Sequence, residues 1–599
     1  MVGVAGVLCA ATGAVSCGGS PRGPSADLIV VNARVWTVDA AKPEAEAVAV
    51  RGDRIVEVGT RAEIERMRGT TTRVVDGAGR FLMPGFNDAH IHLMTGGAQL
   101  DSVDLKDAAT PAEFARRIGE RARATARGEW ILGGNWDEQQ WPGAPLPTRG
   151  LVDALTPDTP VFVHRYDEHM SLANSLALRL AGVTAKTPDP PGGLIVRDAS
   201  GNPTGILKDS AQAYVFKIIP APTPEQRVRT LKRALGHMAS LGVTSVQDMG
   251  PDPDDVATYG TLAARGELTT RIRAVPAEVA LAKQLAAGPV RNKALAFLEV
   301  SGAKGFADGS LGSTTAYFFE PYTDEPSSRG LLADEMQPIE EMRGRLVSID
   351  KAGEQLCIHA IGDQAISMVL DLFADVEKTN GQRDRRPRIE HSQHVAPKDF
   401  ERYARLGVIA SVQPYHAIDD GKWAEKRIGA ERAKTTYAFR SFLDHKVRLA
   451  FGTDWPVAPL DPLQAVYAAV TRATLDGKQP GGWVPEQKVT VAQALEAYTM
   501  GAAYAEFKEK DKGSITAGKL ADLVLLSGDP FKVAPEAIRD LKVAMTMVAG
   551  KVVYEKHQAG DHRVAGVASH RARTALSRRG GTPHPQETRA AARALRSSC

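Results

Sequence analysis

The sequence predicts an α/β protein built on a (β/α)8 barrel, together with a small β-sandwich formed by the two ends of the body. Three observations predict this class. Short apolar runs typical of buried strands alternate with longer helical patterns through most of the chain. Two β-branched segments broken by Gly and Asp lie near opposite ends of the body. His, Lys and Asp recur where the predicted strands end, which is where such barrels carry their chemistry.

The composition is that of a globular protein with more than one core. The 599 residues are 43% hydrophobic, 24% charged and 6% aromatic, which excludes a disordered chain and a coiled coil. The net charge of +3 comes from residues 557–599, a tail that holds eight Arg against two acidic residues. We expect this tail to be a disordered, solvated extension, and its charge gives no reason to expect a nucleic-acid partner.

Residues 1–25 have the features of an export leader. The small apolar run from Val2 to Val15 ends in Ala14-Val15-Ser16-Cys17, which resembles a signal sequence followed by a bacterial lipobox with Cys17 as the lipidated residue. We therefore expect a periplasmic protein or a membrane-anchored lipoprotein, and a cytoplasmic one if the leader is not a signal. No later run of 18 apolar residues occurs, so an N-terminal lipid would be the only membrane contact.

The two ends of the body, residues 26–82 and 513–556, are predicted to form one composite β-sandwich. Each end carries short β-branched runs, and neither has enough apolar faces to form a core alone, so the two are expected to pair. The runs are Asp27–Asp39, Ala47–Val50, Arg54–Gly59, Ala521–Leu526, Val543–Gly550 and Lys551–Tyr554.

Residues 83–512 are expected to form the barrel. Its eight strand candidates are Phe81–His92, Val243–Asp248, Arg271–Ala277, Val300–Asp308, Gln355–Ala360, Arg388–His391, Val408–Gln413 and Arg448–Asp454. Their spacing is regular except after the first strand, where an insertion over residues 93–241 intervenes. An insertion of that size at the mouth of a barrel is expected to cover the site.

Polar residues at the strand ends predict a metal site. The first strand ends in His90 and His92, the fourth carries Lys304 and Asp308, the fifth ends in His359, the sixth in His391 and the eighth in Asp454. Residues i and i+2 of a strand share a face, so both first-strand histidines can point to the barrel axis. Imidazoles and a carboxylate that converge there are ligands suited to a divalent ion such as zinc.

Lys304 is unusual because a lysine in a crowded apolar strand is costly as a cation. Its neutral amine can react with carbon dioxide to give a carbamate, an anionic ligand able to bridge two metals. The alternative is a lysine that extends to the barrel rim or pairs with Asp308. We favour the carboxylated lysine.

From about Asp27 to Glu555 the chain resembles the amidohydrolase superfamily, and within it the amidohydrolase-3 or YtcJ-like branch. The motifs that carry the resemblance are Pro84–His92, Gly134–Asp137, Asp167–Asn174, Asp308–Ser313, Ile389–Gln393, Phe451–Val457 and Gly518–Val524. Two departures are Thr453, where Ser is commoner, and Glu168, where the branch often has Gly. Glu168 could narrow or charge the pocket.

The resemblance implies a ligand set and a mechanism. His90, His92, His359 and His391 become metal ligands, Lys304 falls on the fourth-strand lysine that is carboxylated in several members, and Asp454 is both ligand and proton shuttle. The site would hold one or two divalent ions, most plausibly zinc. A metal-bound hydroxide would then hydrolyse a non-peptide C–N bond of an N-substituted amide, formamide or cyclic amide, with Asp454 and His391 as catalytic residues.

Six further residues are candidates for contact with the substrate: Trp136, Asp137, His169, Asn174, Asp308 and His416. For Trp136, a place in the core of the insertion is at least as good an interpretation. The expected partner is a small amide-type substrate, and a homodimer is left open. Two other functions remain: a lactone or phosphoester hydrolase that uses the same metal site, and a non-catalytic binding protein, which the complete ligand set disfavours. The physiological substrate cannot be read from the sequence.

Overall fold

The computed structural model describes residues 25–125, 128–287 and 294–556, and nearly all of the expected leader and the whole expected tail lie outside these residues. Within the described part of the chain, no helix combines the length and the apolar character needed to cross a membrane.

Each of the eight predicted barrel segments contributes a strand to one of two five-stranded sheets, whose ladders are parallel except at one edge. The first has the order β17-β18-β16-β15-β8, and only its edge strand β17 is antiparallel. Its strands are β8 (Phe86–Ile91), β15 (Val243–Met249), β16 (Arg271–Val275), β17 (Ala294–Leu295) and β18 (Leu298–Val300). The second has the order β19-β20-β21-β22-β23 and is parallel throughout. Its strands are β19 (Ala303–Phe306), β20 (Leu356–Ala360), β21 (Arg388–His391), β22 (Ile409–Val412) and β23 (Leu449–Phe451).

The two sheets meet at both ends. A parallel bridge between Ala277 and Lys304 joins β16 to β19. On the other side the described residues carry no ladder between β8 and β23, but Asp454 N donates to His90 O at 2.7 Å and Thr453 N donates to Asp88 Oδ1 at 2.9 Å. The strand order and these joins give a barrel-like α/β fold in which β8 and β23, which carry the predicted ligands, are neighbours.

Helices follow the strands and pack on the same core. They are α6 (Pro224–Ser240), α7 (Pro253–Ala264), α8 (Glu278–Ala287), α9 (Ile339–Lys351), α10 (Asp363–Asn380), α11 (Phe400–Leu406), α14 (Phe439–Asp444) and α15 (Pro462–Thr471). The start of α6 shows how the local sequence begins one of these helices. Thr223 and Gln226 form a reciprocal capping box, and Pro224 occupies the first turn, where its missing N–H costs nothing. Its buried face packs into the barrel core through Leu231, Leu235 and Met238. The last helix of the predicted insertion therefore belongs, by its packing, to the barrel layer.

The rest of the predicted insertion builds a sheet of its own, which the sequence analysis did not foresee. Its order is β13-β14-β12-β11-β10-β9. The strands are β9 (Val103–Asp104), β10 (Gly133–Trp136), β11 (Phe162–Arg165), β12 (Met170–Ala173), β13 (Gly193–Arg197) and β14 (Pro203–Asp209). Helix α3 (Pro111–Ala124) covers it through Phe114 and Ile118, which share a buried cluster with Trp136 and Val163.

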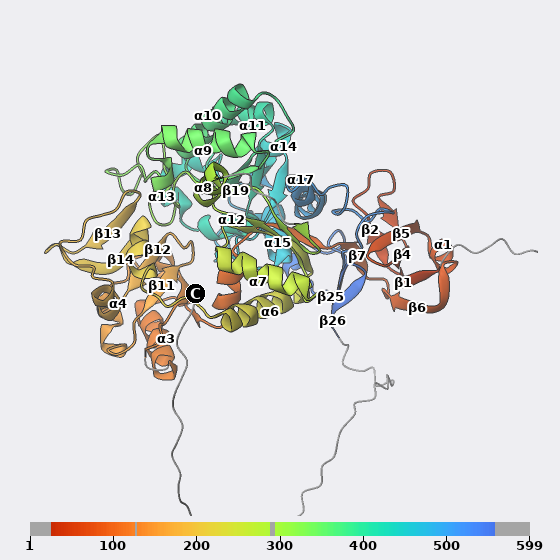
Figure 1. The fold of residues 1–599 in the computed structure, drawn as a ribbon, viewed down its shortest axis with the longest axis horizontal. Helices are drawn as coiled ribbons and strands as arrows, with labels where there is room; N and C mark the ends of the chain where they lie inside the picture. Colours follow the sequence, from red (N-terminus) through yellow and green to blue (C-terminus); the bar gives the residue numbers. More distant parts are fainter. Residues whose placement is uncertain (1–24, 126–127, 288–293, 557–599) are drawn as a thin grey trace, which may run out of the picture. The chain divides into compact units, whose positions relative to one another are not determined.

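The two ends of the body meet in two further sheets (Figure 1). One has the order β5-β4-β1-β6, and the other has the order β26-β25-β24-β7-β2-β3. Their strands are β1 (Ala26–Val31), β2 (Arg34–Trp36), β3 (Glu44–Ala45), β4 (Ala47–Arg51), β5 (Arg54–Gly59), β6 (Arg68–Asp76), β7 (Phe81–Pro84), β24 (Leu523–Leu526), β25 (Val543–Val548) and β26 (Lys551–Glu555). Residues of both sheets, including Val30, Val48, Leu82 and Leu525, share one buried cluster.

One predicted strand is corrected. The run Phe81–His92 was expected to be a single barrel strand, but it divides at Gly85. β7 pairs with β24 in the terminal sheet, whereas β8 pairs with β15 in the barrel. Gly85 suits this change of sheet because a Cβ at this position would lie 2.2 Å from Thr244 Cγ2.

Candidate metal centre

The end of β8 places two imidazoles beside one carboxylate. His90 lies in the buried strand and His92 is the residue before helix α2 (Leu93–Gln99). Their Nε2 atoms lie 3.4 and 3.2 Å from Asp454 Oδ1. The expectation that residues i and i+2 of this strand reach the same point is therefore met in the structure.

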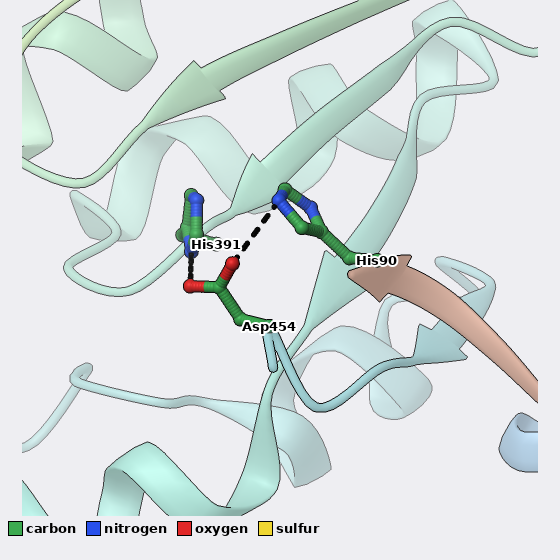
Figure 2. A group of neighbouring side chains, drawn as sticks. All are labelled: His90, His391 and Asp454. Carbon is green, nitrogen blue, oxygen red and sulfur yellow. Dashed lines mark ion pairs between the residues drawn. The ribbon is translucent and has the colours of Figure 1, made fainter. Parts of the chain in front are cut away.

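The third imidazole reaches Asp454 from the end of β21. His391 Nδ1 lies 3.9 Å from Asp454 Oδ2, and one ligand atom from each of His90, His391 and Asp454 falls within 4.8 Å of the others (Figure 2). Both His391 (φ 72°) and Asp454 (φ 61°) have left-handed backbone conformations. Such strain in non-glycine residues is typical of functional sites, where the surrounding structure holds it in place.

His359 and Lys304 adjoin this cluster from β20 and β19. The ring of His359 lies 4.4 Å from that of His391, but its Nε2 faces Gly309 O at 3.1 Å and Asp308 Oδ1 at 3.6 Å. Lys304 is 1% exposed, and its Nζ has no hydrogen-bond partner among the residues described. Burial lowers the pKa of Lys304, which favours the neutral amine.

The donor set fits a divalent cation. His90 Nε2 and Asp454 Oδ1 are both buried without a hydrogen-bond partner in the described part of the chain, although they face each other. Burial lowers the pKa of His90 to about 4 and that of His391 well below its usual value, so these imidazoles are neutral and able to act as ligands. Burial raises the pKa of Asp454, but the attraction of His90 and His92 lowers it by more. The net pKa is below the usual value, so this carboxylate is ionised. Neutral nitrogens around one anionic oxygen are a zinc-type ligand set.

A buried carboxylate that the sequence analysis did not assign orients His90. Glu390 Oε2 lies 2.7 Å from His90 Nδ1, and Arg388 Nε lies 2.7 Å from Glu390 Oε1. All three side chains are 0% exposed. The bond to Glu390 occupies Nδ1, so Nε2 is the nitrogen that faces the cluster. Carboxylates outside the ligand set commonly orient metal-ligating histidines in this way. The signal was present in the sequence: Arg388 and Glu390 are i and i+2 in a buried strand, where unpaired charges are not tolerated.

Three of the six predicted substrate residues lie at the site. His416 Nε2 is 4.0 Å from Asp454 Oδ2. His169 Nδ1 forms a 2.6 Å ion pair with Asp209, which overcomes the effect of burial and raises the pKa of His169 to about 9. Asp308 accepts hydrogen bonds from the backbone N–H groups of Ile361, Gly362 and Tyr317, so it holds the loops beside His359.

The structure places the side chains of the other three within the insertion. Trp136 is fully buried in the core of the insertion, where its Nε1 donates to Val163 O. Asn174 caps helix α4 (Ser175–Leu180) and bonds to Thr156, so its amide is used within the insertion. Asp137 pairs with the buried Arg165 at 3.0 Å. None of the three lines the cavity at the metal centre.

Residues of the insertion and of the barrel line a cavity of about 30 Å³ at the cluster. It is lined from the barrel by His359, His391, His416 and Asp454, and from the insertion by Tyr166, Asp167 and His169. Gln393 also lines this cavity. A second cavity of about 240 Å³ lies behind His169 and is lined by Glu168, Asp209 and Asp308. Side chains of the insertion and of the barrel therefore face the same cavity.

Fold and site together define a metal-dependent hydrolase of the barrel-like α/β class. Comparison with known proteins supports this: residues 73–554 match the Amidohydrolase family. The chain belongs to the amidohydrolase family and is a hydrolase that acts on C–N bonds.

Two curated relatives and one solved structure cover most of the chain. "Protein LONG AFTER FAR-RED 3" of Arabidopsis thaliana is 38% identical over 89% of this chain and 92% of its own length. "N-substituted formamide deformylase" of Arthrobacter pascens is 30% identical over 88% of this chain and 98% of its own. The crystal structure of an uncharacterized metal-dependent hydrolase from Pyrococcus horikoshii OT3 superposes with a TM-score of 0.69 at 30% identity, covering 85% of this chain and 99% of that one.

Proposed function

We propose that the protein hydrolyses the C–N bond of a small N-substituted amide, in particular a formamide or a cyclic amide, with one or two zinc ions. The observation that carries the proposal is the convergence of His90, His391 and Asp454, in which His90 Nε2 and Asp454 Oδ1 are buried without hydrogen-bond partners in the described residues. Such atoms are costly to bury unless a ligand satisfies them.

The metal would be held by His90, His92, His391 and Asp454, with His359 and a carboxylated Lys304 completing a two-ion site. Bound there, a divalent ion supplies Lewis acidity that acidifies water and polarises the substrate carbonyl. A carbamate on Lys304 forms when the neutral Nζ attacks carbon dioxide and releases one proton. Its negative charge would offset part of the charge of the ions.

Asp454 is assigned the proton transfers. Its carboxylate accepts the proton of the attacking water and passes it to the leaving nitrogen, which must be protonated before the C–N bond can break. Its left-handed backbone aims both oxygens into the cluster, Oδ1 toward His90 and His92 and Oδ2 toward His391 and His416. His391 Nδ1 lies 3.0 Å from Gln413 Oε1, and this contact fixes the orientation of the His391 ring beside Asp454.

The formamide class is supported by the deformylase relative, which aligns over nearly its whole length. The small size of the cavity at the cluster favours a substrate whose reacting carbonyl carries a small group. A formyl group is the smallest acyl group available.

The test is a substrate panel with the zinc-reconstituted protein. N-formyl and N-acyl amines, a cyclic amide, a lactone and an organophosphate are assayed at fixed metal, beside Asp454→Asn and the surface control Asp371→Asn, whose side chain is 73% exposed. We expect N-formyl amines to be cleaved fastest and Asp454→Asn to lose about 10²- to 10⁴-fold in kcat, with Asp371→Asn unchanged. A preference for the lactone or the organophosphate would overturn the C–N assignment.

A further inference from the structure

The wall of the metal-centre cavity carries a side-chain amide with an unmatched acceptor. Gln393 is 4% exposed and lines the cavity together with His391, His416 and Asp454. Within the described part of the chain, its Oε1 is buried without a hydrogen-bond partner. A buried carboxamide offers one acceptor and two N–H donors, and leaving them unmatched costs free energy.

The backbone that presents Gln393 is firmly held. His391 and Ser392 have consecutive left-handed conformations, φ 72° and 45°, which turn the chain sharply at the end of β21. Ser392 Oγ donates to Ile389 O at 3.0 Å, and Gln393 O accepts from Tyr437 N at 2.7 Å. The turn is thus tied down on both sides of the peptide, and it brings the side chains of His391 and Gln393 to the same cavity.

Two other buried glutamines of the barrel use both ends of their amides for structure. Gln355 Nε2 donates to Ala505 O at 2.9 Å, and its Oε1 accepts from Arg273. Gln247 Nε2 donates to Ala502 O at 3.1 Å, and its Oε1 accepts from Arg388. Both lie at buried positions with both ends of the amide matched. Gln393 differs from them in its cavity position and in its unmatched oxygen.

We propose that Gln393 is a substrate-positioning residue whose Oε1 accepts the N–H of a secondary amide substrate. The inference rests on the proposed function and narrows it to secondary amides, R–NH–C(O)–R′. An N–H donor satisfies the buried oxygen, and the Gln393 NH₂ group is free to donate to a second polar atom of the substrate. This contact fixes the leaving nitrogen on the side of the cavity where Asp454 supplies its proton.

His416 supports the assignment of this wall to the substrate. It is 6% exposed, its ring is stacked 6.4 Å from that of His391, and its Nε2 has no hydrogen-bond partner among the described residues. Two unmatched polar side chains therefore face one cavity beside Asp454. Neither serves the packing of the barrel through that atom.

The consequence is a preference for secondary amides that the shape of the cavity alone would not give. Tertiary amides and esters lack the N–H and leave Gln393 Oε1 desolvated and unpaired. A site built to hydrogen-bond a substrate N–H rejects analogues that lack it. We expect the secondary amide to be favoured about 10- to 100-fold in kcat/KM.

The test compares N-butylformamide, N-butyl-N-methylformamide and butyl formate. Turnover is measured with the zinc-loaded wild type, Gln393→Leu, Gln393→Glu and the exposed control Gln479→Leu. Binding of the same compounds is measured by calorimetry, and metal content and thermal unfolding are recorded for each variant. Gln393→Leu should lose the preference for the secondary amide in both turnover and binding, with its metal content unchanged. Gln393→Glu, which keeps an acceptor oxygen, should retain much of it.

The outcomes separate the two proposals. If Gln393→Leu keeps the wild-type ratio between N-butylformamide and its N-methyl analogue, or if the wild type binds the two equally, the assignment of Gln393 is overturned. If the wild type binds the secondary amide more tightly through Gln393 but turns over none of the three compounds, the proposed function fails and the binding assignment stands.

Discussion

Replacing Glu390 with Gln should weaken metal binding although Glu390 is not itself a metal ligand. The Glu390 carboxylate accepts from His90 Nδ1 at 2.7 Å and pairs with Arg388 at 2.7 Å, and none of the three side chains is exposed. Burial would raise the pKa of Glu390, but Arg388 and then His90 lower it well below its usual range, so the group is an anion. A carboxamide of the same size removes that charge and makes His90 a weaker ligand.

The size of the effect follows from these contacts. Loss of a carboxylate behind a metal-ligating histidine costs about 10- to 100-fold in metal affinity, or about 1.4–2.8 kcal/mol. The variant also leaves Arg388 as a buried cation without a counter-charge, which costs about 3–5 kcal/mol in the free energy of unfolding. No solvent screening reduces this figure, because the pair is fully buried.

The assay is chelator competition for zinc with the wild type, Glu390→Gln and the exposed control Glu401→Gln. Urea unfolding of the metal-free proteins gives the second quantity. A folded Glu390→Gln protein whose zinc Kd stays within about twofold of the wild type would refute the reasoning, because Glu390 would then have no influence on His90.

Three further predictions follow from other parts of the chain. Lys304→Ala should lower metal stoichiometry and activity together, and short carboxylic acids should partly restore both; unchanged metal content by elemental analysis would contradict a carboxylated lysine. Glu168→Gly should raise the free energy of unfolding by about 1 kcal/mol in denaturant titrations, because Glu168 has φ 60°, which glycine adopts without strain; a less stable variant would show that its carboxylate holds the insertion in place. The full chain, expressed in a bacterium, should appear in the envelope fraction, shortened and lipid-modified at Cys17, whereas a cytoplasmic protein that keeps residues 1–20 would count against export.

The positions of the ligands could be predicted from the sequence because a strand end is a local feature. His90 lies near the end of β8, His391 ends β21 and Asp454 follows β23, and parallel strands bring such ends to one edge. The alternation of strands and helices gave the barrel strands for the same reason. The division at Gly85 was missed because β7 and β8 follow one another as two fully buried strands, and only tertiary pairing decides which sheet each one joins.

Contacts between residues distant in sequence could not be predicted from the sequence pattern. Trp136 and Asn174 are typical binding-site residues by type, yet they serve the core and a helix cap of a sheet that the sequence analysis did not foresee. Glu390 and Gln393 lie beside a predicted ligand, but their roles depend on partners: Glu390 faces His90, which is 300 positions away, and Gln393 faces a cavity that the insertion completes. The sequence pattern predicts which face of a strand a residue lies on. It does not predict which side chains of the facing element will contact that residue.

The central claim is that His90, His92, His391 and Asp454 hold a divalent metal, and elemental analysis of the purified protein tests it most directly. The wild type should contain one or two equivalents of a divalent ion, and the His90→Ala/His92→Ala double variant should lose the ion held between β8 and Asp454. His445→Ala, which removes an exposed histidine, should keep the full content. A double variant that is folded and retains all of the wild-type metal would contradict the site.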